Sequence, residues 1–300
     1  MPADGLPSVS VIVPVYNQAD TLPTTLPALL DQDHPAEIVL VDDGSGDGSG
    51  DVLRTLIDGR STARVIAHEA NRGRAAARNT GIAEATGKVL LFLDGDMRPA
   101  PDFVRQHALA HRAPGVVGVV SSPVLEGLNL RDPYHRYVQS RRGASAGQDG
   151  EAVHFKYFII GYTSVKAEAV RAVGGFDERF TYGEDIDFAI RLHEHAPGGL
   201  VYSARARVHH YAHGTLGDRL RKLRAFGRSN LPLLFEKHPE AMNAANLGFV
   251  ASPVRWLLRP AVAATLRPLL PALPGALQHA AVRYLVATTI ARAYRDAPAR

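Results

Sequence analysis

Residues 88–96, with the sequence KVLLFLDGD, contain the clearest strand signal in the chain. Its five consecutive apolar residues, between a lysine and an aspartate, are typical of a β-strand buried on both faces of a sheet. Similar apolar runs occupy residues 8–15, 37–41 and 63–68. Helical patterns lie between these runs, at residues 19–30, 52–57 and 74–85. The alternation predicts an α/β protein in which parallel strands are joined by right-handed helical crossovers.

The composition limits the class of protein. Of the 300 residues, 46% are apolar and 21% are charged, which excludes a chain that is disordered throughout. There is no cysteine, so disulfide scaffolds, thiolate zinc sites, iron–sulfur clusters and cysteine nucleophiles are excluded. The first residues show no basic segment before an apolar run, and the uncharged stretch 268–282 is too short and too rich in proline to cross a bilayer. We therefore expect a cytoplasmic protein.

After residue 96 the pattern is less regular. Strands are expected at residues 115–120 and 199–210, with a β-rich part at 154–165. Helices are expected near residues 101–111, 130–142, 167–173 and 186–195, and a loop at 143–150. Beyond residue 214, apolar residues at helical spacing with basic residues between them predict one more helix through Leu216, Leu220, Leu223 and Phe226.

The residues that follow three of the predicted strands are candidates for a binding site. Ligands of open parallel sheets bind outside the carboxyl ends of the strands. The candidates there are Pro14, Tyr16, Asn17, Asp42, Asp43, Asp94 and Asp96. Asp94 and Asp96 flank a glycine directly after a buried strand, an arrangement that suits a hard divalent cation. A surface turn of the Asp-Gly type is the structural alternative.

The glycine-rich segment 44–50 matches neither a dinucleotide-binding motif nor a calcium-binding loop. A dinucleotide-binding fingerprint is excluded because the segment follows the second strand and has Ser49 where the last glycine belongs. A calcium loop starting at Asp43 is excluded because its twelfth position is Arg54 rather than glutamate. What remains is a loop suited to hydrogen bonds with a base or a sugar, or a solvated turn.

Two further clusters carry titratable groups. The sequence GEDID at residues 183–187 places three acids at the start of a helix, which exceeds what helix capping needs and makes a general base possible. The histidines 209, 210 and 213 cluster at the end of the strand at 199–210, without the glutamate of a zinc hydrolase motif. A single histidine that completes an oxygen-rich metal site is favoured over zinc, and structural histidines are the alternative.

Six segments occur in one order: SVIVPVYNQADTL, VDDGSGDGSGD, NRGRAAARNTGI, LLFLDGDMRP, GGFDERF and GEDIDFAIRL. Together they resemble the family-2 glycosyltransferases over about residues 8–213. The resemblance implies the GT-A (Rossmann-like) fold, with a mostly parallel central sheet flanked by helices. It divides a catalytic domain, residues 1–213, into a nucleotide-sugar-binding half at 8–120 and an acceptor and catalytic half at 121–213. Residues 214–300 then form a helical C-terminal extension.

The resemblance also implies roles for single residues. The nucleotide-binding positions are Pro14, Tyr16, Asn17, Asp42, Asp43, Arg72, Arg78 and Asp94, with Glu184 beside them. Asp94 and Asp96 match the metal-binding D-x-D, where Mn²⁺ or Mg²⁺ is expected, and His210 or His209 matches a histidine that completes the metal shell. Asp185 matches the catalytic base. Thr163 and Ser164 fall where residues on the acceptor side are expected.

The implied reaction is the transfer of a sugar from a nucleotide-diphospho donor to an acceptor hydroxyl, with inversion. The resemblance favours UDP as the nucleotide carrier. Sugars, lipid-linked sugars and glycans are the expected acceptors, in polysaccharide, glycolipid or cell-envelope glycan synthesis. A nucleotidyltransferase-like enzyme is one alternative, although it should carry a glycine-rich phosphate loop after the first strand. A non-catalytic nucleotide-sugar-binding protein is the other, and the intact Asp94, Asp96 and Asp185 speak against it.

The charge is unevenly distributed. Residues 1–203 contain 19 lysines and arginines against 26 acids, whereas residues 204–300 contain 15 against 4. Apolar blocks broken by arginines and prolines, with Trp256 beside Arg255 and Arg259, suit a membrane interface. We expect this region to lie on an anionic membrane surface as a peripheral attachment to the inner face, or else to pack on the catalytic core. Nucleic-acid binding is not expected, because aromatic residues are sparse there and no recognition motif occurs.

Overall fold

The computed structural model describes residues 5–141, 147–211, 214–245, 248–250 and 258–298. The chain divides into two compact units, which are considered separately. The first contains residues 1–126, 143–179 and 184–211, and the second contains residues 127–142, 180–183 and 212–300. The chain therefore enters the second unit twice before its C-terminal part.

The first unit contains an eight-stranded sheet in the order β3-β2-β1-β4-β7-β6-β8-β5. The strands are β1 (Val9–Val15), β2 (Glu37–Asp42), β3 (Ala63–Ala67), β4 (Val89–Leu93), β5 (Met97–Pro99), β6 (Gly118–Glu126), β7 (Tyr162–Lys166) and β8 (Leu200–Tyr211). As predicted, β1 to β4 are mutually parallel neighbours. Beyond them β7 runs antiparallel to both β4 and β6, so the sheet is mixed. The short β5, which pairs with β8, was not predicted.

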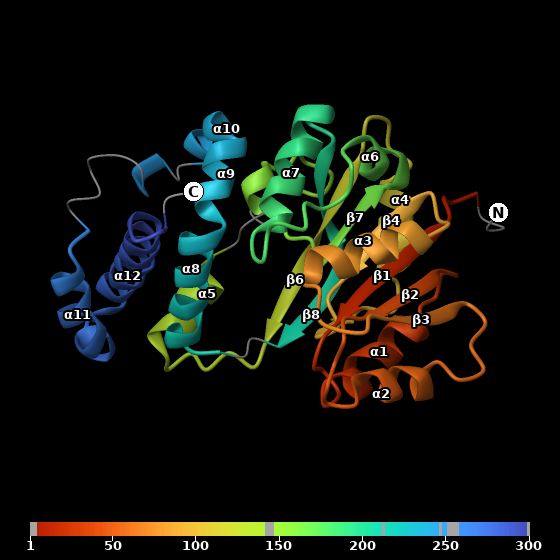
Figure 1. The fold of residues 1–300 in the computed structure, drawn as a ribbon, viewed down its shortest axis with the longest axis horizontal. Helices are drawn as coiled ribbons and strands as arrows, with labels where there is room; N and C mark the ends of the chain where they lie inside the picture. Colours follow the sequence, from red (N-terminus) through yellow and green to blue (C-terminus); the bar gives the residue numbers. More distant parts are fainter. Residues whose placement is uncertain (1–4, 142–146, 212–213, 246–247, 251–257, 299–300) are drawn as a thin grey trace. The chain divides into compact units, whose positions relative to one another are not determined.

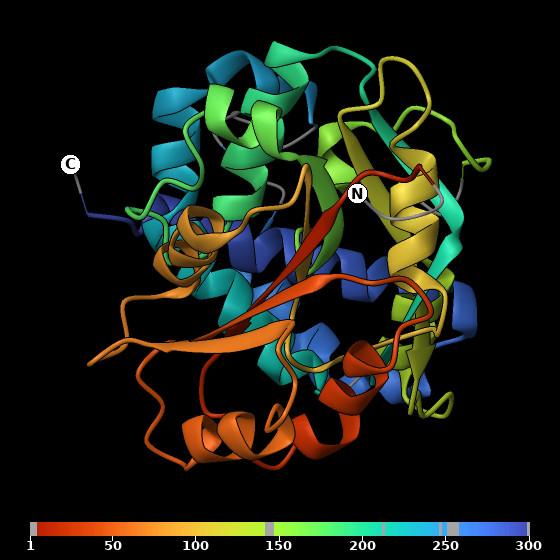
Figure 2. The ribbon, with the colours of Figure 1, turned by 90° about the vertical axis from the view of Figure 1, so that its right-hand side faces the viewer.

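Helices cover both faces of this sheet. Figure 1 shows α3 (Arg74–Glu84) on one face of β1 to β4, with α1 (Leu22–Leu30) and α2 (Ser49–Leu56) on the other, and Figure 2 shows the same layers from the side. The helix α7 (Glu184–His195) shares the face of α3, because Phe188 stacks on Phe176 and Phe176 meets Phe92 of β4 edge to face. A Cβ on Gly81 of α3 would lie 2.3 Å from a side-chain carbon of Ile12 on that same face.

The helix α4 (Phe103–Ala110) lies on the opposite face. Its His107 contacts Ser164 of β7, and Ser164 is paired in register with Leu91. The neighbouring pair, Phe92 with Thr163, points to the α3 side, because successive side chains of a strand alternate between faces. The short α6 (Ala167–Ala172) directly follows β7.

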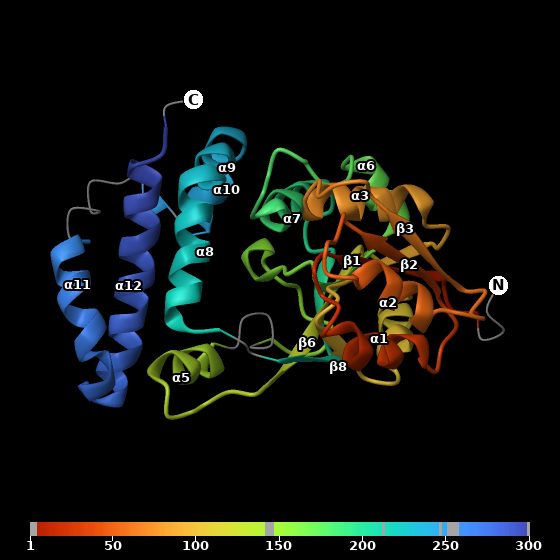
Figure 3. The same ribbon diagram turned by 60° about the horizontal axis from the view of Figure 1, so that its bottom comes forward.

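The second unit is helical. It contains α5 (Pro133–Ser140), α8 (Leu216–Ser229), α9 (Leu231–Lys237), α10 (Pro239–Ala244), α11 (Pro260–Leu269) and α12 (Gly275–Arg295). Figure 3 shows α8, α12 and α11 side by side in that order, and α12 packs against both neighbours. Its packing is close at Gly227 of α8, where a Cβ would come within 2.9 Å of Ala293 Cβ. The helix predicted from the spacing after residue 214 is thus confirmed as α8.

Two prolines mark helix starts in this C-terminal region, whereas Pro268 lies inside α11 and does not end it. Pro260 opens α11 and Pro274 precedes α12, so each helix starts where a missing backbone N–H is tolerated. Arg255 and Trp256, like His213, lie outside the described residues. No helix in the described part of the chain combines the length and the apolar character that crossing a membrane requires.

Candidate functional site

The loops after β1 and β2 form one rim at the carboxyl ends of the strands. Asn17 has a left-handed backbone, with φ of 51°; its backbone N–H donates to Ser45 Oγ, and its Oδ1 accepts from the N–H of Gly46. Two residues on, the N–H of Ala19 donates to Asp47 Oδ2. These contacts fasten the two loops together. Pro14 lies within β1, and the ring of Tyr16 is half exposed at the edge of the rim.

The two aspartates after β2 are buried. Both carboxylate oxygens of Asp43 accept hydrogen bonds from the next loop: Oδ1 from the N–H of Arg72, and Oδ2 from Gly73 N–H and Asn71 Nδ2. His68 Nδ1 lies 2.7 Å from Asp43 Oδ1. The structure therefore uses Asp43 to hold the loop that leads into α3.

Asp42 Oδ1 accepts a hydrogen bond from the backbone N–H of Ser45. The other oxygen, Oδ2, lies close to Gly50, where a Cβ would come within 2.6 Å of it. Asp42 is 7% exposed. The acidic pair thus lies beneath the rim and supports it, and the hydrogen bonds described here are fewer for Asp42 than for Asp43.

The arginines of the segment after β3 have different surroundings. The Arg78 side chain is 2% exposed, and its guanidinium donates to Glu184 Oε1 at 2.6 Å and to Asp94 Oδ1 at 2.9 Å. The Arg72 side chain is 55% exposed and lies 3.6 Å from Glu178. Of the two predicted nucleotide contacts, Arg72 is open to a ligand, whereas the two donor groups of Arg78 are used by carboxylates.

Sequence reasoning missed Arg74. It lies one helical turn before Arg78 on α3, so both side chains face the same way. Its Nε is 3.8 Å from Glu184 Oε1, and 44% of its side chain is exposed. The spacing of four residues to Arg78 was the signal that could have identified it.

The two carboxylates of the Asp-Gly-Asp segment lie where β4 ends. The backbone N–H of Asp94 donates to the carbonyl of Gly161, and a Cβ on Gly161 would be 2.3 Å from Asp94 Oδ2. Only glycine therefore lets this backbone approach the carboxylate. The Asp94 side chain is one third exposed and that of Asp96 about half exposed, so both remain accessible to a ligand.

The two neighbouring histidines of β8 have different partners. His210 Nε2 is 3.8 Å from Asp96 Oδ2. His209 Nδ1 is 2.6 Å from Glu126 Oε1, and the same carboxylate accepts from Arg98. Because successive side chains of a strand alternate between its faces, only one of the pair can share a face with Asp96, and in this structure that residue is His210.

These groups fit a divalent cation at a site where some coordination positions stay open for a substrate. Asp94, Asp96 and His210 offer carboxylate oxygens and one imidazole, a donor set suited to Mg²⁺ or Mn²⁺ when phosphate oxygens of a substrate supply further ligands. Within the described residues, no three of the histidine, aspartate and glutamate side chains already stand together in a metal-binding arrangement. Such a site would be completed by its substrate.

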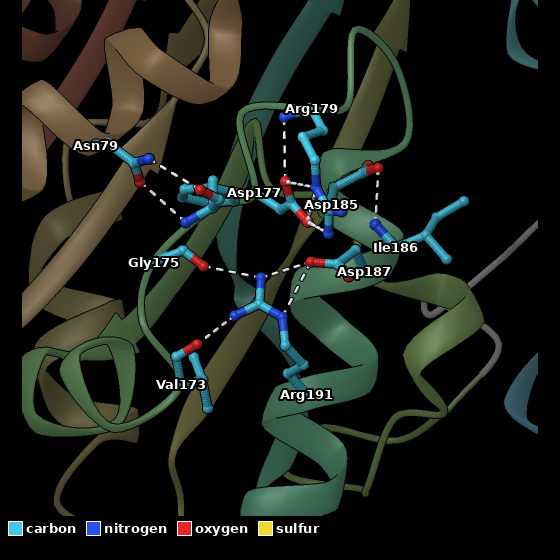
Figure 4. Close-up of polar contacts among 10 residues, drawn as sticks. Asn79, Val173, Gly175, Asp177, Arg179, Asp185, Ile186, Asp187 and Arg191 are labelled. Atoms are coloured by element: carbon cyan, nitrogen blue, oxygen red, sulfur yellow. Dashed lines mark hydrogen bonds and ion pairs between the residues drawn. The ribbon is translucent and has the colours of Figure 1, made fainter. Parts of the chain in front are cut away.

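Asp185 lies at the start of α7, next to Glu184. Burial, followed by the charge of Glu184, raises the pKa of Asp185 to about 7, while Arg78 and Arg74 act in the opposite direction. Its Oδ1 accepts from the backbone N–H of Ile186 (Figure 4). A carboxylate with a pKa near neutrality can accept a proton at physiological pH, which a general base must do.

Tyr162 marks the neighbourhood of this base. Burial first, and then the charges of Asp185 and Asp94, raise the pKa of the Tyr162 hydroxyl above its ordinary value. Asp185 and Asp94 are therefore near enough to act on the same phenol. The structure brings the D-x-D segment and the GEDID segment to one place, although 86 residues of sequence lie between them.

The third acid of GEDID has a structural role. Asp187 is fully buried, and its Oδ2 accepts from Arg191 at 2.6 Å (Figure 4). The same guanidinium donates to the backbone carbonyls of Val173 and Gly175. Asp187 thus anchors α7 to the turn after α6, and none of these contacts involves a residue of the candidate site.

The expected acceptor-side role of Thr163 and Ser164 is wrong. Both lie inside β7 with no exposed surface. Thr163 Oγ1 donates to the carbonyl of Ile159, and Ser164 Oγ lies 2.7 Å from His107 Nδ1 and 2.8 Å from His111 Nε2. Their hydroxyls are therefore committed to the core and cannot contact an acceptor.

Several known proteins resemble this chain in sequence. Residues 10–174 match the family model described as Glycosyl transferase family 2. The chain is 31% identical over 239 residues to the pre-mycofactocin glycosyltransferase of Mycobacterium tuberculosis, covering 77% of this chain and 48% of that protein. It is 31% identical over 220 residues to validoxylamine A glucosyltransferase of Streptomyces hygroscopicus, covering 63% of this chain and 52% of that protein. The chain spans about half the length of these two curated relatives.

Solved structures share the fold. The mannosyltransferase PcManGT from Pyrobaculum calidifontis, in complex with GDP-Man and Mn²⁺, has a TM-score of 0.63 at 22% identity and covers 99% of this chain and 90% of its own. TarS of S. aureus, residues 1–349 in complex with UDP-GlcNAc, has a TM-score of 0.59 at 16% identity and covers 96% and 90%. Identities this low show the fold alone. The family match and the curated relatives show that the chain belongs to glycosyltransferase family 2.

Proposed function

We propose that this protein transfers a sugar from a nucleotide-diphospho donor to an acceptor hydroxyl with inversion at the anomeric carbon. The observation that carries the proposal is Asp185, a carboxylate whose pKa is raised to about 7, placed beside the strand ends that present Asp94 and Asp96. A proton acceptor and a candidate metal and phosphate site thus lie in the same unit of the chain.

In this mechanism the donor lies on the rim formed by the loops after β1 and β2, with its diphosphate toward the end of β4. Asp94, Asp96 and His210 would hold a divalent cation, and such an ion would supply positive charge to offset that of the departing nucleoside diphosphate. Asp185 takes the proton from the acceptor hydroxyl, whose oxygen then forms the new bond to the anomeric carbon as the bond to the diphosphate breaks. One base and one displacement give inversion.

The exposed arginines complete the donor side. Arg72 and Arg74 are cations at the edge of the same rim, and guanidinium groups suit the oxygens of a diphosphate. UDP is the proposed carrier, on the sequence resemblance. TarS of S. aureus was solved with UDP-GlcNAc and PcManGT with GDP-Man, so both bases must be compared directly.

The test is calorimetric binding of UDP and GDP, with and without Mn²⁺, to the wild type and to Asp96→Ala. We expect one nucleotide to bind in a Mn²⁺-dependent way, and Asp96→Ala to weaken that binding at least tenfold, about 1.4 kcal/mol. Asp31→Ala, which removes an exposed carboxylate of the same unit, serves as the matched control and should bind as the wild type does. No Mn²⁺-dependent binding of any nucleotide diphosphate would overturn the proposed function in favour of a scaffold protein.

The acceptor is proposed to be a sugar, a lipid-linked sugar or a glycan of polysaccharide, glycolipid or cell-envelope synthesis. We propose in addition that the second unit contacts an anionic membrane surface. Residues 241–295 contain six arginines and no acid. In α11 no residue is buried, and the exposed large apolar side chains of this region include Val262, Leu269 and Leu277. Two of these arginines pair with Asp296 just beyond this range, and the apolar side chains beside the remaining arginines favour the interface of an anionic bilayer.

Co-sedimentation with vesicles tests the membrane contact. At low salt we expect the full chain to pellet with vesicles rich in phosphatidylglycerol but not with pure phosphatidylcholine. Leu269→Asp combined with Leu277→Asp should reduce the pelleted fraction strongly, because each change places an acid in the interface. Leu109→Asp makes the same change at an exposed leucine of α4 and should pellet normally. An intact protein that stays in the supernatant would contradict this part of the proposal.

A further inference from the structure

Arg78 occupies the centre of a buried ion network that joins three elements of the first unit. Its guanidinium reaches Glu184 Oε1 on α7 with one nitrogen and Asp94 Oδ1 at the end of β4 with another. Glu184, like Arg78, is 2% exposed. The guanidinium also lies over the ring of Phe176, 5.7 Å from its centroid. A residue of α3 therefore connects the strand that carries the D-x-D segment to the helix that carries the proposed base.

Charges buried in this way are costly unless their partners are well placed. Removing one member of a buried ion pair leaves an uncompensated charge, which is strongly unfavourable. The planar fork of arginine can hold two carboxylates at fixed angles, whereas lysine presents a single point charge. Glu184 has a second cation, Arg74, at 3.8 Å, but Arg74 is nearly half exposed and contributes less constraint.

We infer that Arg78 is a positioning residue of the transfer reaction: by holding Asp94 and Glu184 together it places Asp185, the next residue of α7, against the donor. The inference rests on the proposed function and assigns Arg78 a role other than contact with the nucleotide. A displacement of about 1 Å at reacting groups can cost about 100-fold in rate. Loss of Arg78 therefore acts on turnover more than on donor binding.

The experiment compares Arg78→Met and Arg78→Lys with Arg191→Met. Arg191 is the matched control, because it is also ion-paired to an acid of GEDID and also donates to neighbouring groups, yet it lies outside the site. For each variant, kcat, donor KM and the calorimetric Kd of the Mn²⁺–nucleotide complex are measured per folded molecule, with the folded fraction taken from circular dichroism.

We expect Arg78→Met to lower kcat about 100-fold while the nucleotide Kd stays within about threefold of the wild type, and Arg78→Lys to recover part of kcat. Arg191→Met should lower thermal stability and leave kcat per folded molecule unchanged. A Kd weakened tenfold or more in Arg78→Met, with kcat retained, would assign Arg78 to the nucleotide instead. An Arg78→Met enzyme as active per folded molecule as Arg191→Met would reduce Arg78 to a structural residue.

Where Arg78→Met does not fold, a double-mutant cycle of Arg78→Lys with Glu184→Gln gives the answer. If both residues act through one contact, the double variant loses about as much kcat as the more damaged single variant. Losses that multiply overturn the inference. Failure of the proposed function is seen separately, since it leaves the wild type without Mn²⁺-dependent nucleotide binding or sugar transfer.

Discussion

Two polar clusters are buried on opposite faces of the same sheet, and they differ in charge. On the α3 face, Arg78 joins Asp94 to Glu184 through ion pairs. On the α4 face, His107 and His111 share the hydroxyl of a serine on β7. Burial lowers the pKa of His107 well below its ordinary value and that of His111 to about 3, so both rings are neutral.

The difference shows what each cluster can do. The two histidines form hydrogen bonds with serine hydroxyls and are closed to solvent, which suits a group that holds α4 to the sheet. The arginine cluster lies at the strand ends, where one third of Asp94 remains exposed and can exchange partners with a ligand. A neutral network stabilises the fold, and a charged one next to solvent supplies the candidate site.

The largest expected effect comes from the proposed base. Asp185→Asn removes the proton acceptor and should lower kcat about 1,000-fold, since general-base catalysis contributes about 100- to 10,000-fold. Binding of the nucleotide with Mn²⁺ should be retained. Rates and calorimetry on the same preparation check both statements, and an active Asp185→Asn enzyme would remove Asp185 from the mechanism.

The neighbouring Asp187 provides the contrast within one motif. Asp187→Asn removes the fully buried acid of the pair and leaves the partly exposed Arg191 without its charged partner, and we expect a loss of unfolding free energy of about 3 kcal/mol. Per folded molecule, kcat should equal that of the wild type. Denaturant unfolding and active-site-normalised rates measure the two quantities. A stable but inactive variant would show that the acids of GEDID do not divide their roles in this way.

The two clusters should change the free energy of unfolding in opposite directions when the pH falls. The pKa values of His107 and His111 are lowered on folding, so their contribution is present above the unfolded pKa of about 6.5 and is lost as the pH falls below it. From pH 7.0 to 5.5 this amounts to about 2.5 kcal/mol for the pair. The raised pKa of Asp185 acts in the opposite direction, because the folded state then binds the extra proton.

Denaturant unfolding at the two pH values separates these contributions. Relative to the wild type, Asp185→Asn should lose more stability on acidification, by roughly 1.5 kcal/mol, and His107→Gln should lose less, by about 1 kcal/mol. Equal losses in all three proteins would mean that neither cluster titrates as its burial requires.

The smallest expected effect is on the pH dependence of the reaction. With a pKa of Asp185 at about 7, kcat/KM should fall about tenfold per pH unit on the acid side of that value. Arg74→Met removes a cation that lowers this pKa, so the acid limb should move to higher pH. Arg60→Met, at an exposed arginine paired with Asp31, should leave the limb in place. If the acid limb of Arg74→Met coincides with that of the wild type, Arg74 does not lower the pKa of Asp185.

Much of the fold follows from local pattern. The apolar runs that predicted β1, β2 and β4 are buried strands because an unbroken apolar stretch cannot face water on either side, whereas β3, at the edge of the sheet, is only partly buried. The antiparallel β7 and the short β5 were beyond such reasoning, since strand direction is decided by the pairing partner rather than by the strand itself. Likewise the register that buries Ser164 depends on β4 and β6 together.

The residue types at the strand ends, the two carboxylates around Gly95 and the acid at the start of α7 could all be recognised in the sequence. Spacing along one strand or helix carries that information. The burial of Arg78 between two carboxylates, and the position of His210 rather than His209 beside Asp96, became visible in the folded structure. These outcomes depend on which groups from distant segments meet, because burial and pairing of charge are properties of the packed sheet and its helices.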